Sequence, residues 1–133
     1  MRYLTDRKRA EGKGAAHSGT EQHWYMTASA VALAFLVPTF LIIFGRALGQ
    51  PLEGVVATFS RPFPAILTAL VVVVGMRHFA KGATMMIEDY ARGTARKGLV
   101  IFVHSLSYAV IACALYALAK LTMIGFVFEL MPH

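Results

Sequence analysis

The sequence predicts an all-α integral membrane protein with three transmembrane helices. The chain has 133 residues, of which 57% are hydrophobic, and its mean hydropathy is +0.59. Three apolar stretches approach or exceed the ~20 residues that a helix needs to cross ~30 Å of hydrocarbon. Because the apolar residues are gathered in runs of this length, an ordinary soluble core does not account for them.

Residues 1–23 are polar and basic and contain glycine, so we expect a solvated cytoplasmic tail. This segment lacks the apolar region and the small-residue cleavage site of a signal peptide. Its Asp6 and Glu11 also make a transit peptide a poor interpretation. We therefore expect a bacterial inner-membrane protein rather than an imported organellar precursor.

The first membrane helix is predicted at about 24–45, a range without Lys, Arg, Asp or Glu. Trp24 and Tyr25 suit the membrane interface, where an aromatic ring is in apolar surroundings and its polar tip is in water. Pro38 removes one helical hydrogen bond, a loss that membrane bundles tolerate. In the loop that follows, residues 52–60 could form a small amphipathic surface helix.

The second membrane helix, predicted at about 63–90, is unusual in its charge. Its uninterrupted apolar part covers only residues 63–76, which is too short to cross the bilayer. The span is completed only if Arg77, His78 and Lys81 lie within or near the membrane. Such groups should face the interior of the bundle or extend toward the interface.

The third membrane helix is predicted at about 99–124 and contains His104, with a tail at 125–133. Basic residues then set the orientation, because they concentrate on the cytoplasmic side of bacterial membranes. The N-terminal segment and the loop between the second and third helices carry eight of them: Arg2, Arg7, Lys8, Arg9, Lys13, Arg92, Arg96 and Lys97. The opposite side carries Arg46, Arg61 and Lys120.

This distribution places the N-terminus in the cytoplasm and the C-terminus in the periplasm. The net charge of +6 therefore indicates topology and contact with membrane lipid. Nucleic-acid binding is not expected, since basic residues are not interleaved with exposed aromatic residues.

One face of the second helix carries polar residues at two depths. His78 and Asp89 are eleven residues apart, which puts them within roughly 20° of one face and about 16 Å apart along the axis. Neutral imidazole is a common haem-iron ligand, whereas a hydrogen bond to a neighbouring helix is the structural alternative. Gly75 and Gly82 flank His78 on this face, where they would leave room for a flat macrocycle or for close helix packing.

Other polar residues of this helix have two interpretations each. Arg77 and Lys81 could neutralise haem propionates or bind anionic headgroups, or simply extend toward the cytoplasmic surface. At the end of the helix, the Tyr90 phenol could donate to a quinone carbonyl while Asp89 orients it or relays a proton. An interfacial tyrosine beside a solvated aspartate is the simpler interpretation of the local sequence.

His104 is a second candidate haem ligand. It lies only about 8 Å into its helix, whereas His78 lies about 18 Å from the end of its own. Two ligands of one iron must reach it from opposite faces at the same depth. This mismatch predicts that the second ligand comes from another subunit.

The histidine followed eleven residues later by Asp-Tyr resembles the small hydrophobic membrane anchor subunit of succinate dehydrogenase (complex II). The resemblance covers residues 24–124, and the His23-Trp24 pair before the first helix is similar too. It implies a chain that forms half of a heterodimeric membrane-anchor bundle. In this family His78 would be an axial ligand of haem b, which is shared with the other anchor, the cytochrome b subunit. Tyr90 would hydrogen-bond the ubiquinone carbonyl, with Asp89 beside it.

The resemblance also implies a non-catalytic subunit of an enzyme complex in respiratory electron transport and the tricarboxylic acid cycle. The flavoprotein subunit would oxidise succinate, and the iron–sulfur subunit would carry electrons to ubiquinone. Many relatives carry an arginine near the start of the first helix, whereas this chain has none from residue 14 to 45. A propionate or quinone contact at that point is therefore in doubt, and Arg77 and Lys81 are possible substitutes.

Two other functions stay open at this point. In a cofactor-free assembly or regulatory membrane protein, His78 would be a packing residue and Asp89-Tyr90 an interfacial boundary. In a stand-alone b-type cytochrome, His78 and His104 would bind one haem within this chain.

Overall fold

The computed structural model describes residues 5–10 and 19–131. These residues form α-helices and no strand, and three of the helices are long and apolar enough to cross a membrane. The predicted all-α fold with three candidate membrane spans is thus confirmed. The helices are α1 (Asp6–Ala10), α2 (Gly19–Ala47), α3 (Leu52–Phe59), α4 (Pro62–Tyr90) and α5 (Gly93–Leu130).

Two of the long helices exceed their predicted bounds. Helix α2 begins at Gly19 rather than at residue 24, and α5 runs from Gly93 to Leu130 rather than from 99 to 124. The predicted ends were placed where the apolar residues stop, whereas helical backbone hydrogen bonds continue through the polar turns beyond them. Of the predicted tails, residues 1–4, 11–18 and 132–133 lie outside the described part of the chain.

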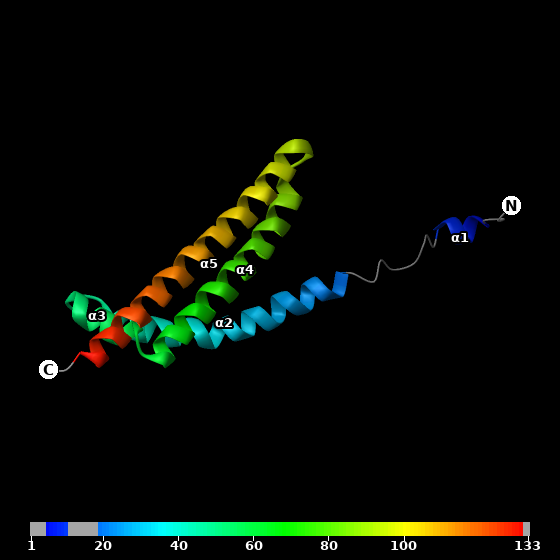
Figure 1. Cartoon of the computed structure of the whole chain (residues 1–133). Helices are drawn as coiled ribbons and strands as arrows, with labels where there is room; N and C mark the ends of the chain where they lie inside the picture. The colour runs from blue at the N-terminus through cyan, green and yellow to red at the C-terminus, as the bar shows by residue number, and fades with distance from the viewer. Residues whose placement is uncertain (1–4, 11–18, 132–133) are drawn as a thin grey trace.

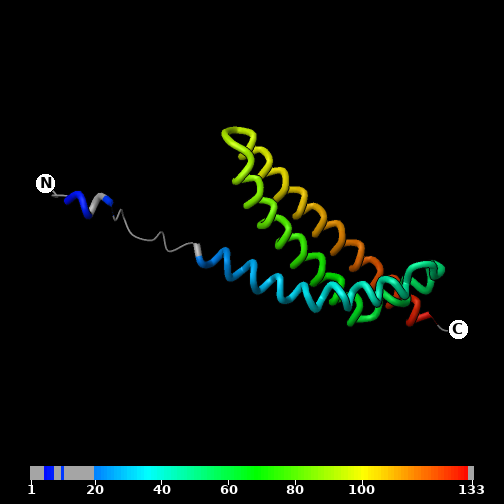
Figure 2. Tube along the Cα trace, turned by 180° about the vertical axis from the view of Figure 1, so that it is seen from behind, coloured from blue at the N-terminus to red at the C-terminus, as the bar shows by residue number. Residues whose placement is uncertain are grey.

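Helix α4 is the central element. It packs against both α2 and α5, whereas α2 and α5 do not contact each other within the described residues. Figure 1 shows α4 and α5 side by side as a long antiparallel hairpin, with α2 crossing α4 obliquely. The view from behind in Figure 2 shows the same arrangement.

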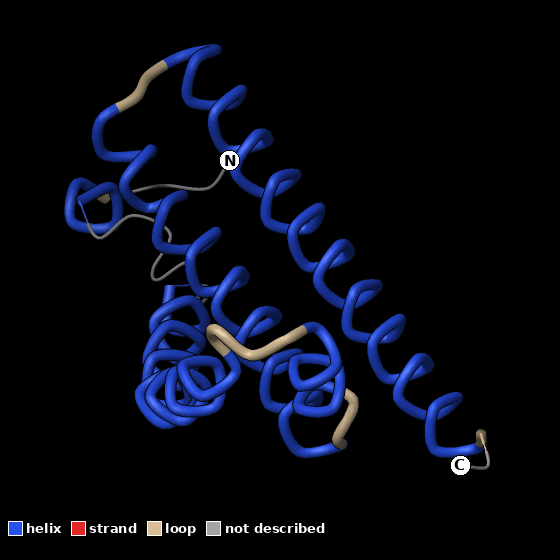
Figure 3. Tube along the Cα trace, turned by 90° about the vertical axis from the view of Figure 1, so that its left-hand side faces the viewer, coloured by secondary structure: helices blue, strands red, loops and turns tan. Residues whose placement is uncertain are grey.

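The tip of this hairpin is a short turn. Ala91 and Arg92 alone separate α4 from α5, as the tan segment at the end of the hairpin shows in Figure 3. Gly93 has a φ of +63°, a left-handed conformation that glycine adopts without the strain of a Cβ. The turn thereby reverses the chain at once, so α5 packs along the whole of α4.

Helix α3 covers the open end of the hairpin. Its Val56 and Phe59 are buried, and the helix contacts α5 more extensively than α4 or α2. The predicted short helix at 52–60 is therefore present. Helix α5 passes the turn after α3 so closely that a Cβ on Gly125 would overlap the side chain of Ser60.

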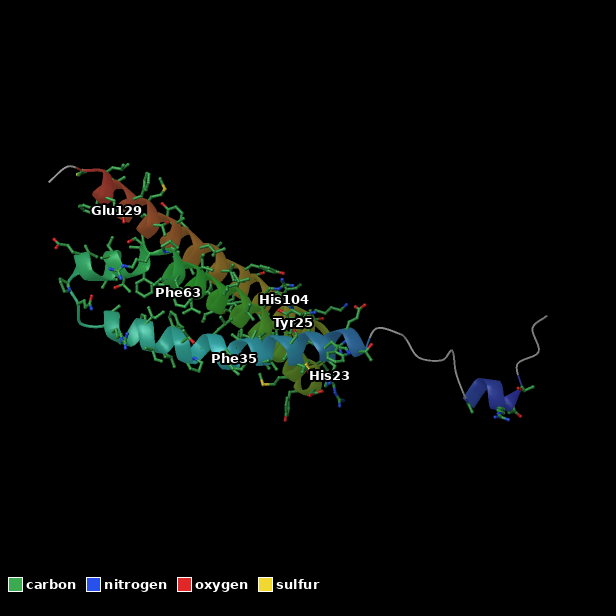
Figure 4. The ribbon with its side chains drawn as sticks, turned by 90° about the horizontal axis from the view of Figure 1, so that it is seen from below. His23, Tyr25, Phe35, Phe63, His104 and Glu129 are labelled. Carbon is green, nitrogen blue, oxygen red and sulfur yellow. The ribbon has the colours of Figure 1, made fainter. Side chains whose placement is uncertain are left out.

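The core is small and the exposed apolar surface is large. Only 6–11% of each candidate membrane window is buried within the chain. Large side chains such as Phe35 and Tyr116 are 73% and 72% exposed, and Figure 4 shows side chains extending outward along the long helices. Apolar surface of this extent is stable against lipid or partner helices rather than water. The chain is thus an integral membrane protein.

Candidate functional site

His78 lies where α4 packs against α2. Its Nδ1 atom is 2.7 Å from Oγ of Ser29 on α2. The same Oγ is 2.7 Å from the carbonyl oxygen of Tyr25 and 3.1 Å from that of Met26. Ser29 is buried and the imidazole is half-buried. The second ring nitrogen, Nε2, has no hydrogen-bond partner among the residues that the structure describes.

Two glycines of α4 lie beside α2 on either side of this contact. A Cβ on Gly75 would lie 3.8 Å from Leu33 Cδ2, and a Cβ on Gly82 would lie 3.7 Å from Met26 Cε. Both glycines therefore face side chains of α2. Of their two predicted roles, the structure favours helix packing, because side chains of α2 border both positions.

The two basic residues of α4 lie where α4 packs against α5. Arg77 and Lys81 line a cavity of about 50 Å³ between α4 and α5. The Arg77 guanidinium carbon is also 5.5 Å from the centre of the Tyr25 ring on α2, which is within the range of a cation–π interaction. Neither side chain bonds to His78. The cavity admits a water molecule or two and is far too small for a haem.

The cavity is lined by residues of the two hairpin helices, namely Arg77, Ala80, Lys81, His104, Ser107, Tyr108 and Ile111. His104 is fixed there by Thr84, whose Oγ1 donates to the Ala80 carbonyl oxygen at 2.7 Å and lies 3.2 Å from His104 Nε2. Because Thr84 has a single hydroxyl hydrogen, the geometry makes Nε2 the donor to it.

The hydrogen bonds of His78 and His104 therefore lie at different levels of α4 and on different sides of it. Thr84, the partner of His104, follows His78 by six residues, which is about 9 Å along the helix axis. His78 bonds to α2, whereas His104 belongs to α5. The structure agrees with the expected mismatch in depth and does not bring the two imidazoles together.

Asp89 and Tyr90 form the last turn of α4. Both are exposed, Tyr90 to 88%. Neither side chain makes a hydrogen bond or an ion pair within the described part of the chain. A contact between the phenol and the neighbouring carboxylate is therefore not present in this chain alone. Both groups are accessible to a ligand or to a second protein.

Ser29 is the residue of this site that the sequence did not predict. It is one of several hydroxyl residues in the apolar part of α2, and Thr27 and Thr39 bond only to the backbone of their own helix. The distinguishing fact is the rotation of α2 against α4, which packing decides. The available signal was a small polar residue in an otherwise apolar helix. This signal is the same at Thr27, Ser29 and Thr39, so it could not single out Ser29.

Comparison with known proteins gives concordant results. The family model of the succinate dehydrogenase/fumarate reductase transmembrane subunit matches residues 1–119. The succinate dehydrogenase hydrophobic membrane anchor subunit of Paracoccus denitrificans is 55% identical over 121 residues, which is 91% of this chain and 94% of the relative. No solved structure matches significantly. The resemblance seen in the sequence is confirmed.

Proposed function

This chain belongs to the family of succinate dehydrogenase/fumarate reductase transmembrane subunits and serves as a succinate dehydrogenase membrane anchor. From this premise we propose that it supplies one axial ligand of a haem b and part of a ubiquinone site. The partners would be the succinate dehydrogenase cytochrome b subunit, the iron–sulfur subunit and the flavoprotein subunit. Succinate oxidation itself would take place on the flavoprotein.

The state of the His78 imidazole supports the haem proposal. One ring nitrogen is bonded to Ser29, while Nε2 has no protein partner in the described residues. Iron-binding histidines commonly use one nitrogen for the metal and hydrogen-bond the other to the protein. Within the described residues, no three His, Cys, Asp or Glu side chains lie close enough together to hold a metal ion by themselves. A haem iron does not require such a group, because it needs only one protein ligand on each face.

The role of this chain in haem binding is then simple to state. Bound haem b supplies one-electron redox chemistry. His78 would hold the iron from one side, and the partner anchor would provide the ligand on the other. Arg77 and Lys81 are the cations of α4 closest in sequence to His78, so we infer that they balance the propionates or anionic lipid headgroups.

Replacing His78 tests the ligand assignment. In His78→Ala, we expect the reduced-minus-oxidised spectrum of the purified complex to lose its b-type signal, because no other imidazole in the described part of the chain lies at that level. His104→Ala is the matched control, since its Nε2 is bonded to Thr84, and it should keep the signal. A b-type spectrum unchanged in His78→Ala would exclude this residue as a ligand.

The quinone proposal rests on the exposed end of α4. A ubiquinone carbonyl is an acceptor, and the Tyr90 hydroxyl is an accessible donor. Quinone reduction also consumes two protons, which a neighbouring carboxylate such as Asp89 can relay. The basic loop beside this end favours the cytoplasmic face of a bacterial inner membrane, which is where the iron–sulfur subunit would dock.

Tyr90→Phe tests this site because it removes only the hydroxyl. We expect quinone reduction by the complex to fall about tenfold, as a lost hydrogen bond to the substrate removes about 1–2 kcal/mol. Succinate oxidation with an artificial dye should persist. Tyr116→Phe on α5, another exposed tyrosine, should change neither activity. Equal loss of both activities in Tyr90→Phe would indicate an assembly defect instead.

A further inference from the structure

We propose that Ser29 is a positioning residue, which holds His78 as the tautomer protonated on Nδ1 and so keeps the lone pair of Nε2 directed to a metal. This inference rests on the proposed ligation of haem iron by His78. It concerns a residue outside the histidine and Asp-Tyr pattern by which the site was predicted.

The hydrogen-bond geometry around Ser29 decides which atom carries the proton. A serine hydroxyl has one hydrogen and two lone pairs. Its Oγ lies 2.7 Å from the Tyr25 carbonyl oxygen and 2.7 Å from His78 Nδ1. Two oxygens at 2.7 Å need a hydrogen between them, and a carbonyl cannot provide it. The serine hydrogen is therefore directed to the backbone, and Oγ accepts from Nδ1–H.

The tautomer of the imidazole follows from this assignment. A neutral imidazole carries one hydrogen, so a hydrogen on Nδ1 leaves Nε2 with a free lone pair. The bond is short and Ser29 is only 6% exposed, so little water competes for its Oγ. Donation from Nδ1–H also makes Nε2 a stronger electron donor to a metal.

The ring is held in place as well as in one tautomer. On either side of the bond, Gly75 and Gly82 face Leu33 and Met26 of α2, at distances where a Cβ would be in ordinary van der Waals contact. Side chains of α2 thus lie beside α4 about one turn before and one turn after His78, and together with the bond to Ser29 they limit where Nε2 points. A bond that only joined two helices would stabilise the chain, whereas a positioning bond also changes the electronic state of the iron.

The test uses the whole complex and measures the haem rather than turnover. In Ser29→Ala, we expect a positive shift of the haem midpoint potential, because the weaker ligand favours ferrous over ferric iron, and altered g values of the oxidised haem in electron paramagnetic resonance. Ser29→Thr keeps a hydroxyl that can bond to the preceding turn and should restore both. Ser107→Ala is the matched control: Ser107 is a buried serine bonded only to Val103 of its own helix.

An unchanged potential and unchanged g values in Ser29→Ala would overturn the proposal. If that variant fails to assemble, Ser29→Cys decides the question. Its sulfur is a weak acceptor, so we expect a smaller positive shift of the midpoint potential. An unchanged potential in Ser29→Cys would contradict the proposal. Failure of the ligand assignment is separate, because it appears as a b-type signal retained in His78→Ala. If His78→Ala loses the b-type signal while Ser29→Ala leaves the midpoint potential and the g values unchanged, only the role of Ser29 is refuted.

Discussion

Hydroxyl side chains in the long helices do two different things. Those of Thr39, Ser107 and Thr122 bond only to carbonyl oxygens of their own helix. Those of Ser29 and Thr84 bond to their own helix and also contact a histidine of a neighbouring helix. Each of these two residues therefore ties α4 to another helix, with α2 on one side and α5 on the other.

Thr84→Val tests the tie to α5. The substitution preserves the shape of the side chain but removes the partner of His104, and interhelical hydrogen bonds in membranes contribute about 0.6–2 kcal/mol. We expect a loss of this size in the free energy of unfolding, measured by titration with a denaturing detergent, and no change in the b-type spectrum. Thr84→Ser should retain the stability, and an equal loss in both variants would point to packing rather than to the hydrogen bond.

The residues of the candidate site were predictable to different degrees. His78, Asp89 and Tyr90 were found because ionisable groups in a membrane helix are rare and because their spacing matched a family. Ser29 was not found, because its importance depends on which side of α2 faces α4. For Gly75, the sequence did not distinguish space for a macrocycle from helix packing. The position of Leu33 beside it in the structure favours packing.

At the scale of the elements, apolar runs predicted the three long helices and residues 52–60 predicted α3. The bounds were less accurate because hydropathy marks where a side chain prefers lipid, whereas a helix ends where its backbone hydrogen bonds end. Arg96 and Lys97 illustrate this difference, since both lie within α5 although their charges suggested a loop. The contact between α5 and the turn after α3 had no signal in the sequence.

Gly125→Ala tests that contact. A Cβ there would overlap Ser60 near its backbone, and overpacking commonly costs about 1–3 kcal/mol. We expect a loss of this size in the stability of the chain in detergent. Gly98→Ala is the control, because nothing lies within 4 Å of its Cβ, and it should be neutral or stabilising by up to about 1 kcal/mol.

A second substitution makes the test specific. In Ser60→Gly the nearest remaining atom to a Cβ at position 125 is the Ser60 Cα, 3.7 Å away. The combined variant Ser60→Gly with Gly125→Ala should therefore recover most of the lost stability relative to Ser60→Gly alone. Additive losses would show that the close approach is not the cause.

At the scale of the whole molecule, the chain is an open layer of helices with α4 in the middle. Such a layer leaves most of its apolar side chains uncovered, and it provides only one face of the proposed haem site. Both features are expected of an anchor whose bundle is completed by a second anchor chain.

Haem retention by the isolated chain tests this incompleteness. We expect the purified chain alone to hold far less than one haem per molecule, because His104 contacts α4 at Thr84, about 9 Å along the axis from His78. Production together with the cytochrome b subunit should restore one haem, measured as the ratio of haem to protein. A stoichiometric b-type haem in the isolated chain would instead support the stand-alone cytochrome.

The bond of Ser29 to its own helix has a consequence for the order of membrane insertion. Ribosomes release α2 before α4, so Ser29 enters the bilayer with its hydroxyl already satisfied by the Tyr25 carbonyl oxygen. His78 has no such local acceptor and finds its bond only on α2. The N-to-C direction of synthesis thus provides the imidazole with a partner as soon as it reaches the lipid, and a chain with its helices permuted would lose that protection during biogenesis.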